Sequence, residues 1–174
     1  MKIRAAAPED APAIARVHVA SWRAIYRGIV SQAFLDAIDE QLRAQMWRNA
    51  FENTPTVKIA VAETEGAVCG FASGGPLRKA ISLYDAELYA IYLHPASMRQ
   101  GLGRALFKFI ADQLAADGMK HLLVWTLRDN PSKGFYERLG GTLVAEEPHE
   151  VGGQTLASVA YGWPEFCTTD PFQR

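Results

Sequence analysis

Hydrophobic side chains recur at every third or fourth position in several parts of the chain, which predicts amphipathic helices. Glu9 and Asp10 open the first of these segments, and Gly118 follows the third, as expected for helix ends. The second segment is interrupted near Asp39. The pattern predicts helices over residues 8–28, 34–51, 101–116 and 131–139.

Shorter apolar runs, bounded by Gly, Pro or charged residues, predict β-strands between these helices. Two of the runs are joined through Thr64-Glu65-Gly66, which indicates a hairpin. Another run, HLLVWTL, is apolar almost throughout, as is typical of a strand that is buried on both faces. The expected strands cover residues 3–6, 57–62, 67–72, 87–94, 121–127, 142–146 and 154–161, with a loop over 74–85.

The order of these elements predicts the fold class. Helices alternate with strands in the order β-α-α-β-β-β-α-β-α-β-β, which indicates an α/β (α+β) fold with helices on both faces of one mixed central sheet. We expect about six to seven strands in that sheet. A chain of 174 residues is long enough for one domain with a sizeable core. We expect this domain over residues 1–163 and a C-terminal tail over 164–174.

Composition narrows the classes of protein. The formal net charge of −1 argues against attraction of the whole protein to nucleic acid or an anionic membrane. No run of about 18 apolar residues is present, so no membrane span is expected. Cys69 and Cys167 lie far apart, which argues against a disulfide framework and favours the cytoplasm. The His and Cys spacing predicts no metal site, and the sequence is compatible with a homodimer.

A glycine-containing turn lies between the strand over 87–94 and the helix over 101–116. Gly101 and Gly103 allow a ligand to approach the backbone at the positive end of that helix. Arg99, Arg104 and Lys108 add positive charge around the turn. The sequence therefore predicts a phosphate site, although an ordinary helix start with two turn glycines would show the same pattern.

A second motif follows the next strand, at residues 130–140 (NPSKGFYERLG). The glycine turn does not match a dinucleotide fingerprint, because Leu106 stands where a third small residue is needed, and it is not a P-loop. Together, the two motifs and the order of elements resemble the Gcn5-related N-acetyltransferase (GNAT) superfamily over nearly the whole chain. The resemblance implies a GNAT-like acyl-CoA N-acyltransferase fold and acetyl-CoA as co-substrate.

The resemblance also implies three groups of cofactor-binding residues. Backbone amides of the glycine turn would bind the pyrophosphate, the edge of the preceding strand would pair with the pantetheine arm, and the second motif would lie near the thiol. Three departures from the family pattern are Met98, in place of the usual Gln or Arg, Gly141, in place of Phe, and a separation of six residues between Asn130 and Tyr136, where some relatives have seven. Arg99 or Arg104 could bind the cofactor in place of residue 98. The implied cofactor-binding residues are Tyr92, Leu93, His94, Arg99, Gln100, Gly101, Leu102, Gly103, Arg104, Ala105, Asn130 and Tyr136.

Acyl transfer to an amine requires a neutral amine and a protonated leaving thiol. A lysine-like amine has a pKa of about 10.4, so only about one molecule in 10³ is neutral at pH 7. We expect Glu87 to be the catalytic base; alternatively, it is a solvated strand-end carboxylate, and a water relay, Asp85 or Glu137 takes the proton. Tyr136 is the expected acid, and the alternative is a packing tyrosine beside Phe135. Trp125 stands where some ribosomal-protein acetyltransferases have a catalytic Glu, which argues against that substrate class.

The acceptor is predicted to be a primary amine. Trp22 and Tyr26 are spaced i, i+4 and could enclose an amine by cation–π contact, or both could pack in the core. We expect an N-acetyltransferase that moves the acetyl group by direct attack in a ternary complex, with a small-molecule acceptor. The alternatives are an enzyme that acts on a peptide or protein amine, and a non-catalytic acyl-CoA-binding module.

Overall fold

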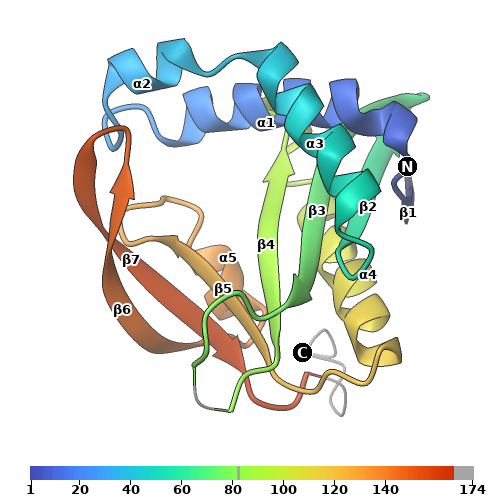
Figure 1. Ribbon diagram of the computed structural model, residues 1–174, viewed down its shortest axis with the longest axis vertical. Helices are drawn as coiled ribbons and strands as arrows, with labels where there is room; N and C mark the ends of the chain where they lie inside the picture. The colour runs from blue at the N-terminus through green and yellow to red at the C-terminus, as the bar shows by residue number, and fades with distance from the viewer. Residues whose placement is uncertain (82, 167–174) are drawn as a thin grey trace.

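The computed structural model describes residues 1–81 and 83–166 and contains one seven-stranded sheet in the order β1-β2-β3-β4-β5-β7-β6 (Figure 1). All neighbouring strands are antiparallel except β4 and β5, which are parallel. The predicted fold class is therefore confirmed. The strands are β1 (Lys2–Ala5), β2 (Lys58–Thr64), β3 (Ala67–Pro76), β4 (Ala86–Leu93), β5 (Leu122–Leu127), β6 (Thr142–Val151) and β7 (Gln154–Trp163).

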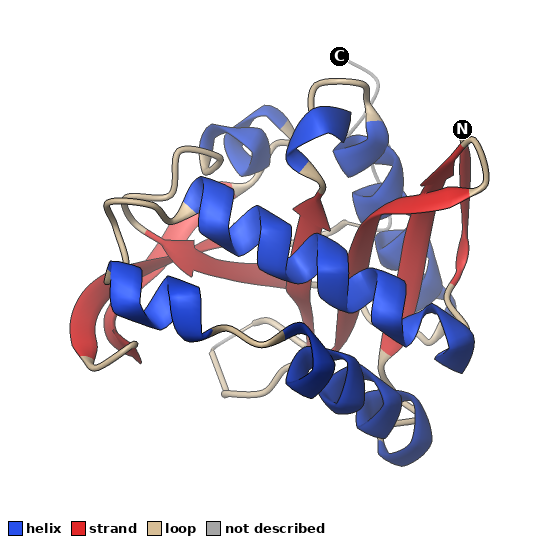
Figure 2. Cartoon of the chain, turned by 90° about the horizontal axis from the view of Figure 1, so that it is seen from above, coloured by secondary structure: helices blue, strands red, loops and turns tan. Residues whose placement is uncertain are grey.

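Helices cover both faces of the sheet, and α1 crosses one of these faces in Figure 2. The apolar side of α4 packs with β2, β3 and β4 in one core, and α1 and α3 pack in a second core on the opposite face. No helix among the described residues is long and apolar enough to cross a membrane. The helices are η1 (Pro8–Asp10), α1 (Ala11–Ile25), α2 (Gln32–Ala37), α3 (Glu40–Asn53), η2 (Pro95–Ser97), α4 (Leu102–Ala116) and α5 (Gly134–Arg138).

The expected break in the second helical segment is confirmed and has a local cause. The side chain of Asp39 accepts a hydrogen bond from the amide of Leu42 at 2.8 Å and caps the start of α3. Ser31 caps α2 in the same way through the amide of Phe34. Because a capping side chain satisfies an amide that has no partner within the helix, each cap specifies a new helix start.

β3 and β6 extend well beyond the ends that the sequence pattern predicts. β3 continues to Pro76, so the loop expected over 74–85 begins later. Glycine is required at Gly74 because β3 and β4 lie close together there: a Cβ would lie 2.9 Å from a β4 carbonyl oxygen. β6 continues to Val151 and contains Pro148, which an edge strand tolerates.

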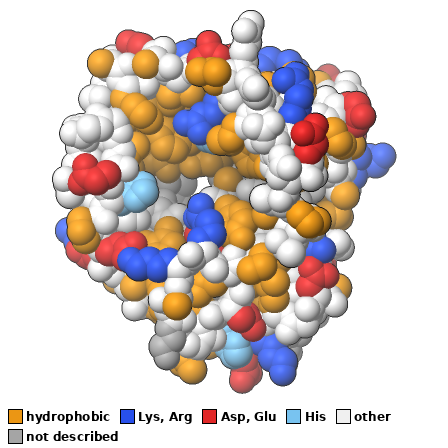
Figure 3. All heavy atoms as spheres, in the orientation of Figure 1, with side chains coloured by type: hydrophobic (Ala, Val, Ile, Leu, Met, Phe, Trp, Pro, Cys, Tyr) orange, Lys and Arg blue, Asp and Glu red, His pale blue; other side chains and the backbone are white. Residues whose placement is uncertain are grey.

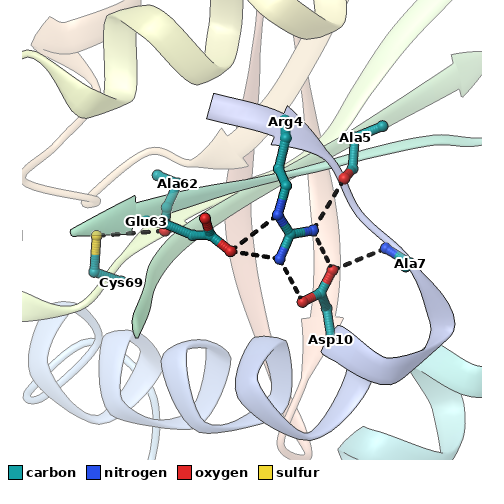
Figure 4. Close-up of polar contacts among 7 residues, drawn as sticks. All are labelled: Arg4, Ala5, Ala7, Asp10, Ala62, Glu63 and Cys69. Atoms are coloured by element: carbon teal, nitrogen blue, oxygen red, sulfur yellow. Dashed lines mark hydrogen bonds and ion pairs between the residues drawn. The ribbon is translucent and has the colours of Figure 1, made fainter. Parts of the chain in front are cut away.

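A charged cluster ties the N-terminal strand to its neighbours (Figure 4). The guanidinium of Arg4 donates to both carboxylate oxygens of Asp10, at 2.6 and 2.8 Å, and to Oε1 of Glu63 on β2. Asp10 also accepts from the amide of Ala7 at 2.8 Å. The Arg4 hydrogen bonds lower the pKa of Asp10, so the cluster stabilises the ionised carboxylate.

The chain beyond β7 remains packed for a few residues. Phe166 is buried in the core on the α4 face, and its amide donates to the carbonyl of Lys120 at 3.2 Å. Residues 167–174 of the predicted tail lie outside the described residues.

Candidate active site

The two central parallel strands separate in the middle of the sheet. β4 and β5 pair only through Ala86–Leu88 and Leu122–Val124, and beyond these residues they diverge (Figure 1). At the same point Tyr89 is skipped in the pairing with β3, between Leu88 and Ala90. A bulge of this kind bends a strand away from its neighbour. The space-filling view shows that this face of the molecule is hollowed at its centre (Figure 3), which makes the space between the strands the candidate site.

The open edge of β4 is set by backbone direction. The amide of His94 donates to a β3 carbonyl at 2.8 Å, and backbone groups alternate along a strand, so Tyr92 faces β3 as well. The backbone groups of Ile91 and Leu93 face the other edge, where the carbonyl of Leu93 accepts the Ser21 hydroxyl at 2.6 Å. We therefore correct the predicted pairing edge: Leu93 stays, and Ile91 replaces Tyr92 and His94.

The glycine turn has the conformation that a phosphate site requires. Gly101, the N-cap of α4, has φ of 81°, and Arg99 has φ of 60°, so both residues are left-handed. A Cβ at Gly103 would lie 3.3 Å from the Phe135 ring, so glycine lets α4 approach α5. The amide of Ala105 is removed from the predicted donors, because it already donates to the carbonyl of Gly101 at 3.1 Å. The amides that precede it lie at the positive end of the helix.

The polar residues predicted around the turn are placed at the surface. Arg99, Gln100 and Arg104 are exposed, and Leu102 is buried as the first residue of α4. The three exposed side chains can therefore surround an anionic group that approaches the start of α4 from solvent.

Asn130 is buried, and its amide group joins three elements. Its Nδ2 donates to Thr126 Oγ1 at 2.8 Å and to Tyr26 Oη at 3.3 Å, and its Oδ1 accepts from the amide of Ser132 at 2.8 Å. Both side-chain donors are thus used within the protein. Asn130 thus holds β5, the C-cap of α1 and the residues before α5 together, and its contact with the pantetheine or thiol end stays a prediction.

Tyr136 on α5 is buried among aromatic rings. Its ring centroid lies 5.4 Å from that of Phe135 and 5.9 Å from that of Tyr161. Burial, and then the nearby Tyr26, raise the pKa of the Tyr136 phenol, so the hydroxyl is protonated at neutral pH. No residue in 1–81 or 83–166 forms a hydrogen bond with this hydroxyl, so its proton is available. The missing side chain at Gly141 also has a reason, since a Cβ there would lie 2.7 Å from Trp163.

Trp22 and Tyr26, the aromatic residues at the end of α1, differ in burial. The ring centroids of Trp22 and Tyr26 lie 4.7 Å apart. Tyr26 is buried, and its hydroxyl oxygen accepts a hydrogen bond from Nδ2 of Asn130. Trp22 is only partly buried. One turn earlier, His18 stacks on Tyr92 at 5.2 Å, and burial lowers the pKa of its imidazole to about 3. Trp22 therefore remains a candidate for the acceptor wall, whereas Tyr26 supports the second motif.

Glu87 is not the solvated strand-end carboxylate that was one reading of the sequence. It is 2% exposed and is paired with Arg78 from the loop after β3. The Arg78 Nε donates to Oε1 at 3.1 Å, Nη2 donates to the same oxygen, and the backbone amide donates to Oε2 at 3.2 Å. This pairing raises the pKa of Arg78. The sequence pattern did not single out Arg78, because nothing local marks a loop arginine as the partner of a strand residue nine positions away.

The chain is similar in sequence to known N-acetyltransferases. The uncharacterized N-acetyltransferase YuaI of Bacillus subtilis is 39% identical over 163 residues, which cover 94% of this chain and 92% of that protein. The L-amino acid N-acyltransferase MnaT of Escherichia coli is 30% identical over 92 residues, 52% of this chain and 53% of that protein.

The same architecture occurs in solved structures. The yncA protein of Salmonella typhimurium, solved with its cofactor acetyl-CoA, has a TM-score of 0.71 and 26% identity, and the match covers 94% of this chain and 92% of that chain. The model of the acetyltransferase (GNAT) family matches residues 20–141, which include the diverging strands, the glycine turn and the second motif. Because this match covers well over half of the chain, the chain belongs to the acetyltransferase (GNAT) family.

Proposed function

We propose that this chain transfers the acetyl group of acetyl-CoA to the primary amine of a small molecule, by direct attack in a ternary complex. Membership in the family supplies the class of activity, an acetyl-CoA-dependent N-acetyltransferase. The observation that carries the proposal is the separation of β4 from β5 beside the glycine turn at the start of α4. An opening next to a helix N-terminus suits an extended ligand with a phosphate group at one end.

The backbone binds the cofactor. The amides of Gly101, Leu102 and Gly103 hold the pyrophosphate, and the open edge of β4 at Ile91 and Leu93 pairs with the amides of the pantetheine arm, as an added strand would. Acetyl-CoA supplies the thioester whose acyl group is transferred. An amide on this edge near Leu93 stabilises the negative charge that develops on the acyl oxygen.

Two side chains move protons. Glu87 accepts the proton of the acceptor ammonium, directly or through a water, and Tyr136 donates a proton to the leaving thiolate. Burial raises the pKa of the Tyr136 phenol, which keeps its proton in place but makes it a weaker acid, so the effect of Tyr136→Phe on kcat decides this role. No three His, Cys, Asp or Glu side chains in 1–81 and 83–166 gather as a metal site, and the proposed steps use only these two residues.

A small acceptor is favoured by the relatives. MnaT is named as an L-amino acid N-acyltransferase, and its match with this chain covers about half of each protein. The partly buried Trp22 offers an aromatic wall of suitable size for a small amine. A peptide or protein amine, and binding without catalysis, are the alternatives that the following experiment separates.

Calorimetry with acetyl-CoA tests the cofactor site. Gly101→Val should weaken binding strongly, because the side chain lies over the phosphate-binding amides. Gly118→Val is the matched control: both glycines are left-handed, at φ of 81° and 88°, and lie at opposite ends of the same helix. Equal affinities of the two variants would refute the phosphate site.

Thiol release with a panel of amines then tests the reaction. Turnover with small amines and not with peptides supports the proposal. Binding of acetyl-CoA without turnover on any amine would identify a non-catalytic module instead.

A further inference from the structure

The ion pair between Glu87 and Arg78 joins a buried group to an exposed one. The side chain of Glu87 is 3% exposed, and that of Arg78 is 59% exposed. A buried carboxylate is costly without a partner, so Glu87 requires a cation at this position. That cation is the guanidinium of Arg78, from a surface loop. The guanidinium can move into solvent at little cost in free energy, because it is hydrated there.

The surroundings of the guanidinium form a binding site for an organic cation. The carbon of the guanidinium lies 4.5 Å from the centroid of the Tyr89 ring, within the range of a cation–π contact. Tyr89 is held in place, because its hydroxyl donates to the carbonyl of Pro76 at 2.5 Å. The backbone amide of Arg78 binds Glu87 independently of the guanidinium. The carboxylate, the ring and the anchored loop would therefore stay in place if the Arg78 side chain moved away.

This cation site adjoins the candidate active site. Glu87 belongs to the last stretch in which β4 pairs with β5, and Tyr89 is the bulged residue at which the strands separate. Other charged groups nearby are engaged elsewhere: Asp85 accepts from the amides of Lys120 and His121, and Lys79 pairs with Glu147. Arg78 is thus the cation that faces Glu87 among the described residues.

We propose that the Arg78 side chain occupies the position of the acceptor ammonium, and that the acceptor displaces it between Glu87 and Tyr89. This inference rests on the proposed function. One monovalent cation replaces another, so the charge of the buried site is unchanged at that step. The carboxylate then takes one proton from the ammonium: an N–H bond breaks, an O–H bond forms, and the amine becomes neutral. The acceptor class is accordingly a monovalent alkylammonium whose amine fits between a carboxylate and a phenol ring.

Binding of methylguanidinium tests the exchange without any need for turnover. In Arg78→Ala the site lacks its own cation, so millimolar methylguanidinium chloride should raise the melting temperature in a saturable way. In the parent protein the same rise should require a higher concentration, because methylguanidinium must first displace the Arg78 side chain. Lys79→Ala is the matched control, because it removes the neighbouring loop cation, which pairs with Glu147. The absence of a rise in Arg78→Ala, or an equal rise in all three proteins, would overturn the inference.

Steady-state kinetics give a second, independent measurement. The acceptor KM should fall in Arg78→Ala, by the reciprocal of the fraction of parent molecules in which Arg78 has left Glu87, and methylguanidinium should compete with the acceptor. An increased KM would mean that the guanidinium itself binds the acceptor, which contradicts displacement. If Arg78→Ala does not fold, Arg78→Gln serves both measurements, since it retains a neutral side chain of similar reach.

The proposed function can fail separately. If Glu87→Gln retains full turnover while methylguanidinium stabilises Arg78→Ala, Glu87 is a cation site and not the base. If Glu87→Gln loses turnover and methylguanidinium stabilises nothing, the base remains and only the displacement of Arg78 is refuted.

Discussion

The buried imidazole of His18 is expected to make folding stability depend strongly on pH. His18 is 7% exposed, and its Nδ1 has no hydrogen-bond partner among the described residues. Burial, and to a smaller extent the positive charge of Arg43, lower its pKa from 6.5 to about 3. Between about pH 3 and pH 6.5 the imidazole of His18 is therefore neutral in the native protein and protonated in the unfolded chain.

The sign and size of the effect follow from proton linkage. Between pH 6.5 and about 3 the unfolded chain binds more protons than the native protein, so stability is complete above pH 6.5 and decreases as the pH falls. From pH 7 to pH 5 the loss from this residue is about 2 kcal/mol, at ~1.36 kcal/mol for each pKa unit. A loss of this size is a large part of the stability of an ordinary domain.

The perturbation is His18→Leu, which has a similar volume and does not titrate. Urea unfolding followed by tryptophan fluorescence, at about pH 7 and about pH 5, gives the free energy of unfolding of each protein. The parent should lose about 2 kcal/mol more than the variant between the two pH values. At about pH 7 the variant should be as stable as the parent or more so, because an unpaired buried nitrogen is removed.

An exposed histidine provides the control. His149 lies on the edge strand β6 and is exposed, so His149→Leu should show the same loss as the parent. If His18→Leu loses as much stability as the parent between the two pH values, His18 is not the group responsible and the reasoning is refuted.

Three further outcomes are expected. Tyr136→Phe should lower kcat by about 10²–10⁴-fold with the acetyl-CoA Kd unchanged, and an unchanged kcat with chemistry rate-limiting would leave Tyr136 as a packing residue. Glu87→Gln should lower turnover chiefly at low pH, where neutral acceptor is scarce, and a pH–rate profile identical to that of the parent would point to an unaided water relay. Arg4→Gln should cost about 1–2 kcal/mol in urea unfolding above the unfolded-state pKa of Asp10, and less as the pH falls through the lowered pKa of that carboxyl, whereas the exposed Lys108→Gln control should cost less than about 0.5 kcal/mol.

The features that depend on neighbours along the chain could be predicted from the residues alone. The break before α3 follows from one aspartate that caps an amide three residues later. The glycine turn follows from residues that tolerate a left-handed backbone at a helix start, and Gly101 adopts that conformation. The order of helices and strands follows from the period of the apolar residues, which distinguishes a helix from a strand within a few turns. These signals predicted the family and the region of the site.

Only the tertiary structure decided which groups of that region are available. In the part of β4 after Glu87, every position carries a side chain that suits a core, so alternation reveals neither the bulge at Tyr89 nor the edge to which Ile91 belongs. A bulge is a property of two strands, and its position depends on the partner. Likewise, one donor of Asn130 is occupied by Tyr26, which is 104 positions away, and the cation beside Glu87 comes from the loop between β3 and β4. These pairings are set by how the sheet, the helices and the loop pack, which the local residue pattern does not encode.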